Sequence, residues 1–322
     1  MKIGYRLEIL MFHRILKDGE EYFIPPMALS CRTFRRLMEW TARTIRVVAL
    51  EDTINKIRKG KFDTASVAVT FDDGYRDNFE LARRILLKAG IPATFFVPIR
   101  QIEAGEVYWW DHLFSVAKTH FGCFKAWLRD NRLPATYQRF LKSPFSDRVG
   151  PLCRSIVRYI NDLGVVERNN FLDALVQEFG LYDGERLLMT WNEISQLKRD
   201  GFSIGSHSLS HIPLTELTTE QAKVEIKDSR AILSNKVDDE IEGFSYPRGR
   251  WNGTLAELAA QEGYSFAVTT RFGSNNESCD LYALARRNLC DYKGVRSLIP
   301  VPMHMLEMTG LLDRFLVKRR TS

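Results

Sequence analysis

The sequence has few of the features that mark several large classes of protein. Its 322 residues include only five cysteines, which are far apart and never in CxxC spacing. This odd, scattered set argues against a disulfide framework or a zinc knuckle and indicates reduced thiols. With 20 glycines, 11 prolines and 45% hydrophobic residues, the chain is neither collagen-like nor a low-complexity sequence.

Long apolar runs are missing as well. No segment approaches the ~18 apolar residues that a membrane span needs. The N-terminal MKIGYRLEILMFHRIL has an apolar stretch too short for a signal peptide and no small-residue cleavage site after it. We therefore expect a cytoplasmic protein without a signal peptide or transmembrane segment.

A large excess of charge of one sign is also absent from the sequence. The 46 Lys and Arg residues exceed the 40 Asp and Glu residues by only +6, spread along the chain, so we expect no nucleic-acid partner. The C-terminal LLDRFLVKRR is basic and amphipathic. A solvated surface helix is the favoured interpretation, and peripheral membrane contact through this segment is the alternative.

Strand and helix signals alternate along most of the chain. Each expected helix lies between expected strands, and its ends carry capping residues, Gly or Pro. The strands are expected at 7–12, 66–71, 93–97, 202–205, 243–245 and 264–270, and the helices at 75–89, 190–201, 218–233 and 252–261. This alternation predicts parallel βα units, hence a barrel or a doubly wound sheet.

The alternation stops between about 106 and 183. This stretch contains aromatic and helical signals such as VYWWDHLFSVAKTHF and NNFLDALVQEF, and no strand alternation. We expect a mostly helical insertion within a single catalytic domain that spans 1–322. Trp110 is a candidate for stacking on a sugar, although packing in a core or lid is the favoured interpretation.

Two adjacent carboxylates, Asp72 and Asp73, follow the strand expected at 66–71. An Asp-Asp-Gly turn can explain the pair without any function. Adjacent side chains at a strand end point in different directions, however, so one carboxylate can bind a metal ion while the other acts as a base.

His207 and His211 follow the strand expected at 202–205. A spacing of four places two imidazoles on one face of a helical turn, where both nitrogens can reach one ion. Asp73 would complete a set of two histidines and one carboxylate, leaving open positions for water and substrate.

Two further features come directly after expected strands. Tyr246 and Pro247 lie in a FSYPRG loop, and His13 ends the first strand. Each has an ordinary structural interpretation. In a parallel barrel, however, the active site lies at the C-terminal ends of the strands, and all these residues fall at such ends.

Together, TFDDGY, SHSLSH and FSYPRG resemble the polysaccharide deacetylases, carbohydrate esterase family 4, also called the NodB-homology family. The resemblance extends from about Leu7 to Asn288. It implies a distorted parallel (β/α) barrel and the metal-dependent hydrolysis of an N-acetyl group on an amino sugar.

The resemblance also assigns roles to individual residues. Asp72 is similar to the family's catalytic base, and Asp73, His207 and His211 are similar to its metal ligands. The turn at Tyr246 and Pro247 resembles the loop that lines the sugar site, where the Tyr246 N–H would donate to the oxyanion.

LMFHRI resembles a branch of the family in which the N-terminal strand supplies the general acid, which points to His13. His304, in VPMHMLE, is the competing candidate. The arginine of the family's third motif is absent, so Arg286 or Arg287 is expected to supply the charge that tunes Asp72.

The implied cofactor is one divalent ion, with zinc as the first expectation and Co, Mn, Ni or Fe as alternatives. The implied substrate is an N-acetylated glycan or a lipid-linked or nucleotide sugar. Two other functions stay open: hydrolysis of a non-sugar C–N bond of the ureide or imide type on the same fold, and glycan binding without catalysis.

Overall fold

The computed structural model describes residues 6–290 except 21, 23, 25, 26, 63, 131 and 132. The chain packs as two units. The sheet unit takes in the chain up to Glu20, Pro26–Gly105 and the chain from Leu188 onward. The helical unit takes in Glu21–Pro25 and Glu106–Leu187. His304 and the basic C-terminal segment lie outside the described residues.

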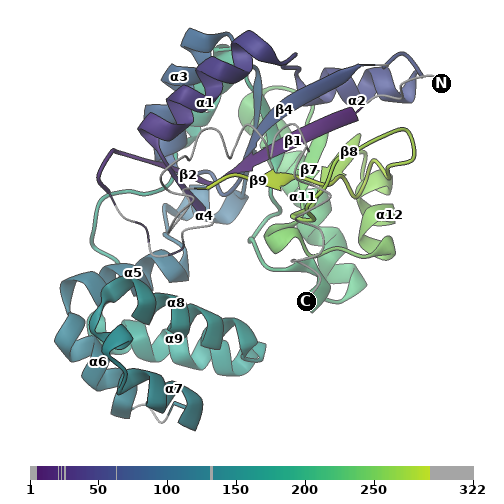
Figure 1. The fold of residues 1–322 in the computed structure, drawn as a ribbon. Coiled ribbons are helices and arrows are strands. Elements are labelled where there is room, and N and C mark those ends of the chain that lie inside the picture. The colour runs from purple at the N-terminus through teal and green to yellow at the C-terminus, as the bar shows by residue number, and fades with distance from the viewer. Residues whose placement is uncertain are drawn as a thin grey trace. The chain divides into compact units, whose positions relative to one another are not determined.

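The sheet unit is built on seven parallel strands in the order β8-β7-β6-β5-β4-β1-β9 (Figure 1). In chain order they are β1 (Arg6–Phe12), β4 (Ala65–Phe71), β5 (Ala93–Val97), β6 (Ser203–Ser206), β7 (Gly243–Ser245), β8 (Phe266–Val268) and β9 (Arg287–Asn288). Leu284 bridges to Val268 of β8, and β9, three residues later, pairs with β1. The segment from Leu284 to Asn288 thus contacts both β8 and β1, so the sheet curls on itself, which confirms the predicted distorted parallel barrel.

Helices surround this sheet. They are α1 (Cys31–Thr44), α2 (Leu50–Arg58), α3 (Arg83–Ala89), α4 (Ile99–Ala104), α10 (Trp191–Arg199), α11 (Thr219–Val237) and α12 (Gly253–Gln261). A π-helical segment, η2 (Asn78–Ala82), leads into α3, and η4 (Leu214–Glu216) and η5 (Pro247–Gly249) are short 3₁₀ turns. Capping boxes at Thr190 and Thr218 begin α10 and α11, and Gly90 ends α3 with a φ of 64°, as their sequences predict.

The pleat of the strands decides which side chains reach the interior. Phe12, Phe71 and Phe95 stack across β1, β4 and β5, with ring centroids 5.4 and 4.8 Å apart, and Phe12 and Phe71 pack against Phe34 of α1. Strand side chains alternate, so the residue after Phe71 points to the other face. That residue is Asp72.

A second, smaller sheet pairs β2 (Arg14–Leu16) with β3 (Ala28–Ser30) in parallel. Because β2 begins two residues after β1 ends, His13 is the single residue between the two strands. The sequence gives no separate signal for either short strand.

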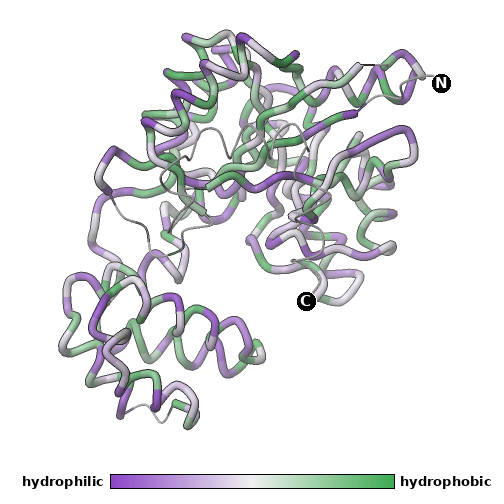
Figure 2. Tube along the Cα trace, viewed as in Figure 1, coloured by the Kyte–Doolittle hydropathy of each residue, from purple (hydrophilic) through white to green (hydrophobic). Residues whose placement is uncertain are grey.

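The helical unit consists of α5 (Trp109–Thr119), α6 (Phe121–Asp130), α7 (Ala135–Leu141), η3 (Pro144–Asp147), α8 (Val149–Asp162) and α9 (Val165–Phe179). Hydrophobic and hydrophilic residues alternate along these helices (Figure 2). Trp110 is buried and stacks on Tyr108, with ring centroids 4.5 Å apart, and Tyr22 donates a hydrogen bond to Asp111. Trp110 therefore packs in the core of this unit.

Among the described residues, no helix is long and apolar enough to cross a membrane. The five cysteines are all free thiols.

Candidate active site

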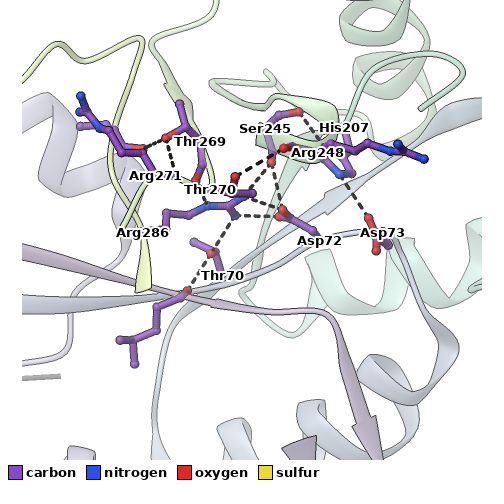
Figure 3. Close-up of polar contacts among 12 residues, drawn as sticks. Thr70, Asp72, Asp73, His207, Ser245, Arg248, Thr269, Thr270, Arg271 and Arg286 are labelled. Carbon is purple, nitrogen blue, oxygen red and sulfur yellow. Dashed lines mark hydrogen bonds and ion pairs between the residues drawn. The ribbon is translucent and has the colours of Figure 1, made fainter. Parts of the chain in front are cut away.

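The polar residues that follow β4 and β6 lie together at the C-terminal ends of the strands (Figure 3). Asp72 and Asp73 come directly after β4, and His207 directly after β6. Strands β4, β5 and β6 are neighbours in one parallel sheet, so their carboxyl ends meet at one edge. The fold thus brings together residues as distant in the sequence as Asp72 and His207.

Asp72 is buried and held by two side chains. Arg286 donates from Nη1 to Oδ1 at 2.8 Å and from Nη2 to Oδ2 at 2.6 Å, and the Ser245 hydroxyl donates to Oδ2 at 3.1 Å. Burial alone would raise the pKa of Asp72, but the charges of Arg286 and His207 and the Arg286 hydrogen bonds outweigh it and lower the pKa. The carboxylate is therefore ionised and fixed in orientation at neutral pH.

Arg286 is itself anchored on all sides. Its Nε donates to the Thr269 carbonyl at 2.8 Å and its Nη1 to the Thr70 hydroxyl at 3.2 Å, and its side chain is fully buried. Of the two candidate arginines, Arg286 is the one that pairs with Asp72. Arg287 points elsewhere and forms a buried ion pair with Glu8 of β1.

Asp73, His207 and His211 form a compact set of three ligand atoms within 4.8 Å of one another. The Nε2 atoms of His207 and His211 lie 3.3 and 3.2 Å from Asp73 Oδ1. Burial alone would raise the pKa of Asp73, but hydrogen bonds from both histidines lower it well below its usual range.

The donor set fits a divalent ion. His207 Nδ1 lies 2.7 Å from the Ser245 carbonyl oxygen, which can only accept, so Nδ1 carries a proton and Nε2 is the ring nitrogen that can bind an ion. Two imidazole nitrogens and one carboxylate oxygen are ligands that Zn, Co, Mn, Ni and Fe accept, with positions left for water and substrate. Among the described residues this is the only such cluster.

The loop between His207 and His211 is not the helical turn that the spacing predicts. Ser208 and His211 adopt left-handed backbone angles, with φ of 68° and 59°, and residues 207–211 form no helix. The expectation of a helical turn was therefore wrong. The two left-handed residues bring the rings together instead, at a cost of about 1 kcal/mol or more for each residue. The rings are 4.8 Å apart between centroids.

Glu225 of α11 holds this loop. One of its carboxylate oxygens accepts the N–H groups of Leu209 and Ser210 at 3.0 and 2.8 Å, and the other accepts the Ser210 hydroxyl. The Ser208 hydroxyl accepts the His211 N–H at 3.0 Å. These bonds offset the cost of the left-handed residues and fix both candidate ligands, His207 and His211.

His13 lies next to this site. The register of β1 and β4 pairs Phe12 with Phe71, so His13 and Asp72 are the next residues along the two strands. The Asp72 N–H donates to the Phe12 carbonyl at 3.0 Å, and the charge of His13 contributes to the lowered pKa of both Asp72 and Asp73. His13 Nδ1 is buried and has no hydrogen-bond partner among the described residues.

The hydrogen bonds of Tyr246 do not leave its N–H free for the predicted role of donating to an oxyanion. Its N–H already donates to the Val268 carbonyl at 3.2 Å, and its hydroxyl donates to the Tyr282 carbonyl at 3.0 Å. Both donors are therefore used inside the barrel, so the prediction that the Tyr246 N–H stabilises an oxyanion does not fit this geometry. Pro247 begins the following turn, in which Arg248 has a φ of 56°.

Left-handed residues other than glycine concentrate at this end of the barrel. The described part of the chain has five, and four of them follow β4, β6 or β7: Asp73, Ser208, His211 and Arg248. The fifth, Asp238, caps a helix. Strained backbone that the surrounding structure maintains is typical of a functional site.

The two neighbouring arginines provide a matched pair of variants. We expect Arg286→Met to lower the free energy of unfolding by about 3–5 kcal/mol, because it leaves the buried Asp72 without its arginine. Arg287→Met should cost less, because Glu8 keeps its ion pair with Arg6 and its hydrogen bond from Ser274. Only Arg286→Met should also alter Asp72. Urea unfolding of the metal-free protein at pH 7 and pH 5 should show a smaller deficit for Arg286→Met at pH 5, where the unpaired Asp72 becomes protonated. A deficit in Arg286→Met that is the same at both pH values would contradict the pairing.

The sequence profile of the polysaccharide deacetylases matches residues 59–144 and 151–267. The chain belongs to the polysaccharide deacetylase family. YxkH of Bacillus subtilis (strain 168), which is described as a polysaccharide deacetylase, is 26% identical to this chain over 283 residues. The match covers 87% of this chain and 70% of YxkH.

Solved structures agree with this fold. The Streptococcus pyogenes deacetylase PplD, determined with acetate, superposes with a TM-score of 0.61 at 18% identity, over 92% of this chain and 97% of PplD. IcaB from Ammonifex degensii gives 0.58 at 17% identity, over 95% and 97%. A de-N-acetylase from Aggregatibacter actinomycetemcomitans gives 0.55 at 15%, over 92% and 99%.

Proposed function

We propose that this chain is a divalent-metal-dependent hydrolase that removes N-acetyl groups from an amino sugar in a glycan or glycan precursor. The observation that carries the proposal is the pairing of an ionised, oriented carboxylate, Asp72, with the adjacent ligand set of Asp73, His207 and His211. A base beside an open three-ligand site is the arrangement that amide hydrolysis by water requires. The family and the deacetylases among its structural neighbours support the same reaction class.

Each residue has one task in this reaction. Asp73, His207 and His211 would hold the ion, which when bound supplies a Lewis acid and lowers the pKa of water. Asp72 accepts a proton from the attacking water while Arg286 keeps its carboxylate in place. His13 gives a proton to the leaving nitrogen as the C–N bond breaks, so the products are acetate and a free amine.

The direct test measures hydrolysis of several substrate classes by metal-free and metal-reloaded protein, as acetate released from the N-acetylated sugars and as consumption of the ureide and the imide. Chitin oligomers, an N-acetylated lipid-linked sugar and a nucleotide N-acetylamino sugar form the glycan arm, and a ureide and a cyclic imide form the other arm. We expect acetate only from the glycan arm and only with Zn, Co, Mn, Ni or Fe restored. Hydrolysis confined to the ureide or imide, or glycan binding without turnover, would overturn the proposal.

A further inference from the structure

Two residues shortly after the metal ligand Asp73 bind the strand segment that carries His13. The Asn78 side-chain amide donates to the His13 carbonyl at 2.7 Å. The carboxylate of Asp77 accepts the Ile15 N–H at 3.0 Å and Arg14 Nε at 2.8 Å. All three residues from His13 to Ile15 are thereby tied to the same two side chains.

These two side chains also fix each other. Asn78 is fully buried, and its amide donates to Asp77 Oδ1 at 2.8 Å as well as to His13. Arg14 is held a second time, since its guanidinium lies 4.8 Å from the centre of the Tyr75 ring. Asn78 is also the first residue of the π-helical segment η2, a rare conformation that is frequent at functional sites.

The backbone of His13 needs such support. β1 ends at Phe12 and β2 begins at Arg14, so neither strand includes His13. Its ring nitrogen Nδ1 has no partner among the described residues, so no bond to that atom orients the ring. The position of the imidazole therefore depends on how firmly its backbone is held, and Asn78 is the side chain that contacts that backbone directly.

We propose that Asn78, with Asp77, is a positioning residue that holds His13 in place for proton transfer to the leaving amine. The inference rests on the proposed function, because it gives His13 the role of general acid. On this view the segment from Asp72 to Asn78 supplies the base, a metal ligand and the anchor of the acid.

The first test uses the full chain loaded with its divalent ion and compares its turnover of two substrates, an amide and an ester. Breaking an amide of a chitin oligomer requires a proton on the leaving nitrogen, whereas 4-nitrophenolate leaves from 4-nitrophenyl acetate as a stable anion. For Asn78→Ala we expect kcat for the amide to fall by about 10–100-fold, the size of effect that a misplaced catalytic group produces, with KM within about twofold. The ratio of amide to ester turnover should fall by nearly the same factor.

Glu80→Gln is the matched control. Glu80 lies on the same segment but pairs with Arg76 at 2.7 Å, and both side chains are more than a third exposed. This control should keep the wild-type ratio of amide to ester turnover. Should Asn78→Ala fail to fold, Asn78→Asp replaces it, because it has the same shape but no amide donor.

A double-mutant cycle separates positioning from general damage to the fold. In a His13→Ala background, Asn78→Ala should change amide turnover by less than about twofold, because the group that it positions is gone. The same loss in both backgrounds, or an equal loss for amide and ester, would overturn the proposal.

Hydrogen exchange tests the anchor without any activity. In the metal-free chain, Asp77→Ala should speed exchange of the Ile15 amide by at least about tenfold, whereas Glu80→Gln should not. Unchanged exchange at Ile15 would show that the anchor does not exist in solution. An enzyme that cleaves the ester but no glycan would instead refute the proposed substrate, and the exchange result would still decide the anchor.

Discussion

Asp72→Asn is expected to lower the rate of acetate release by about 10²–10⁴-fold while the protein keeps its metal ion. Asparagine has the same shape, but its amide cannot accept the proton of the attacking water. The proposed metal ligands Asp73, His207 and His211 are unchanged by the substitution. The measurements are kcat on an N-acetylated glycan and the metal content per chain by elemental analysis.

Ser245→Ala is the control for this prediction. It removes one hydrogen bond to Asp72 but leaves the two from Arg286, so we expect a loss of only a few-fold. A variant Asp72→Asn with wild-type turnover would remove Asp72 from the mechanism, whatever its metal content.

Much of the site could be predicted because parallel sheets collect functional residues at one edge. Asp72, Asp73 and His207 each follow a recognisable apolar strand, and His13 ends the first one. The alternation of strands and helices therefore carries the sequence-distant residues to one place, without any knowledge of how the loops fold. The outline of the fold is predictable for the same reason.

The supporting residues were not predictable in the same way. Glu225 lies on the helix that follows the His207–His211 loop, and Asn78 is the first residue of η2, and polar side chains are ordinary at both places. Their roles depend on which backbone groups happen to face them, and only the folded arrangement decides that. The one available signal is that Asp77 and Asn78 follow the Asp-Asp-Gly turn closely.

Local geometry explains the two expectations that did not hold. The spacing of His207 and His211 suits a helix, but Glu225 stabilises a loop with left-handed residues in its place. Tyr246 follows a strand, as expected, but the carbonyl of Val268, the last residue of β8, accepts the Tyr246 N–H. In both cases a hydrogen-bond partner from elsewhere in the chain decides the outcome.

The largest change in metal content is expected for His207→Ala and His211→Ala. Among the described residues the proposed site has three protein ligands, and each substitution removes one of them. The remaining two ligands cannot hold a divalent ion firmly, so metal content should fall from one ion per chain to near zero after dialysis. The fold should persist, because neither ring belongs to the apolar core of the barrel.

Thermal unfolding with and without added Zn²⁺ checks the same point independently. An ion that binds only the folded chain raises the free energy of unfolding by about 2.7 kcal/mol at a hundredfold excess over its Kd. The wild-type melting temperature should therefore rise on addition of Zn²⁺, and that of either variant should stay within about one degree. His120→Ala is the control, since His120 packs against Phe179 in the helical unit and should leave the Zn²⁺ response unchanged. A full complement of metal in His207→Ala and in His211→Ala, with the wild-type rise in melting temperature, would show that the ion is held elsewhere in the chain.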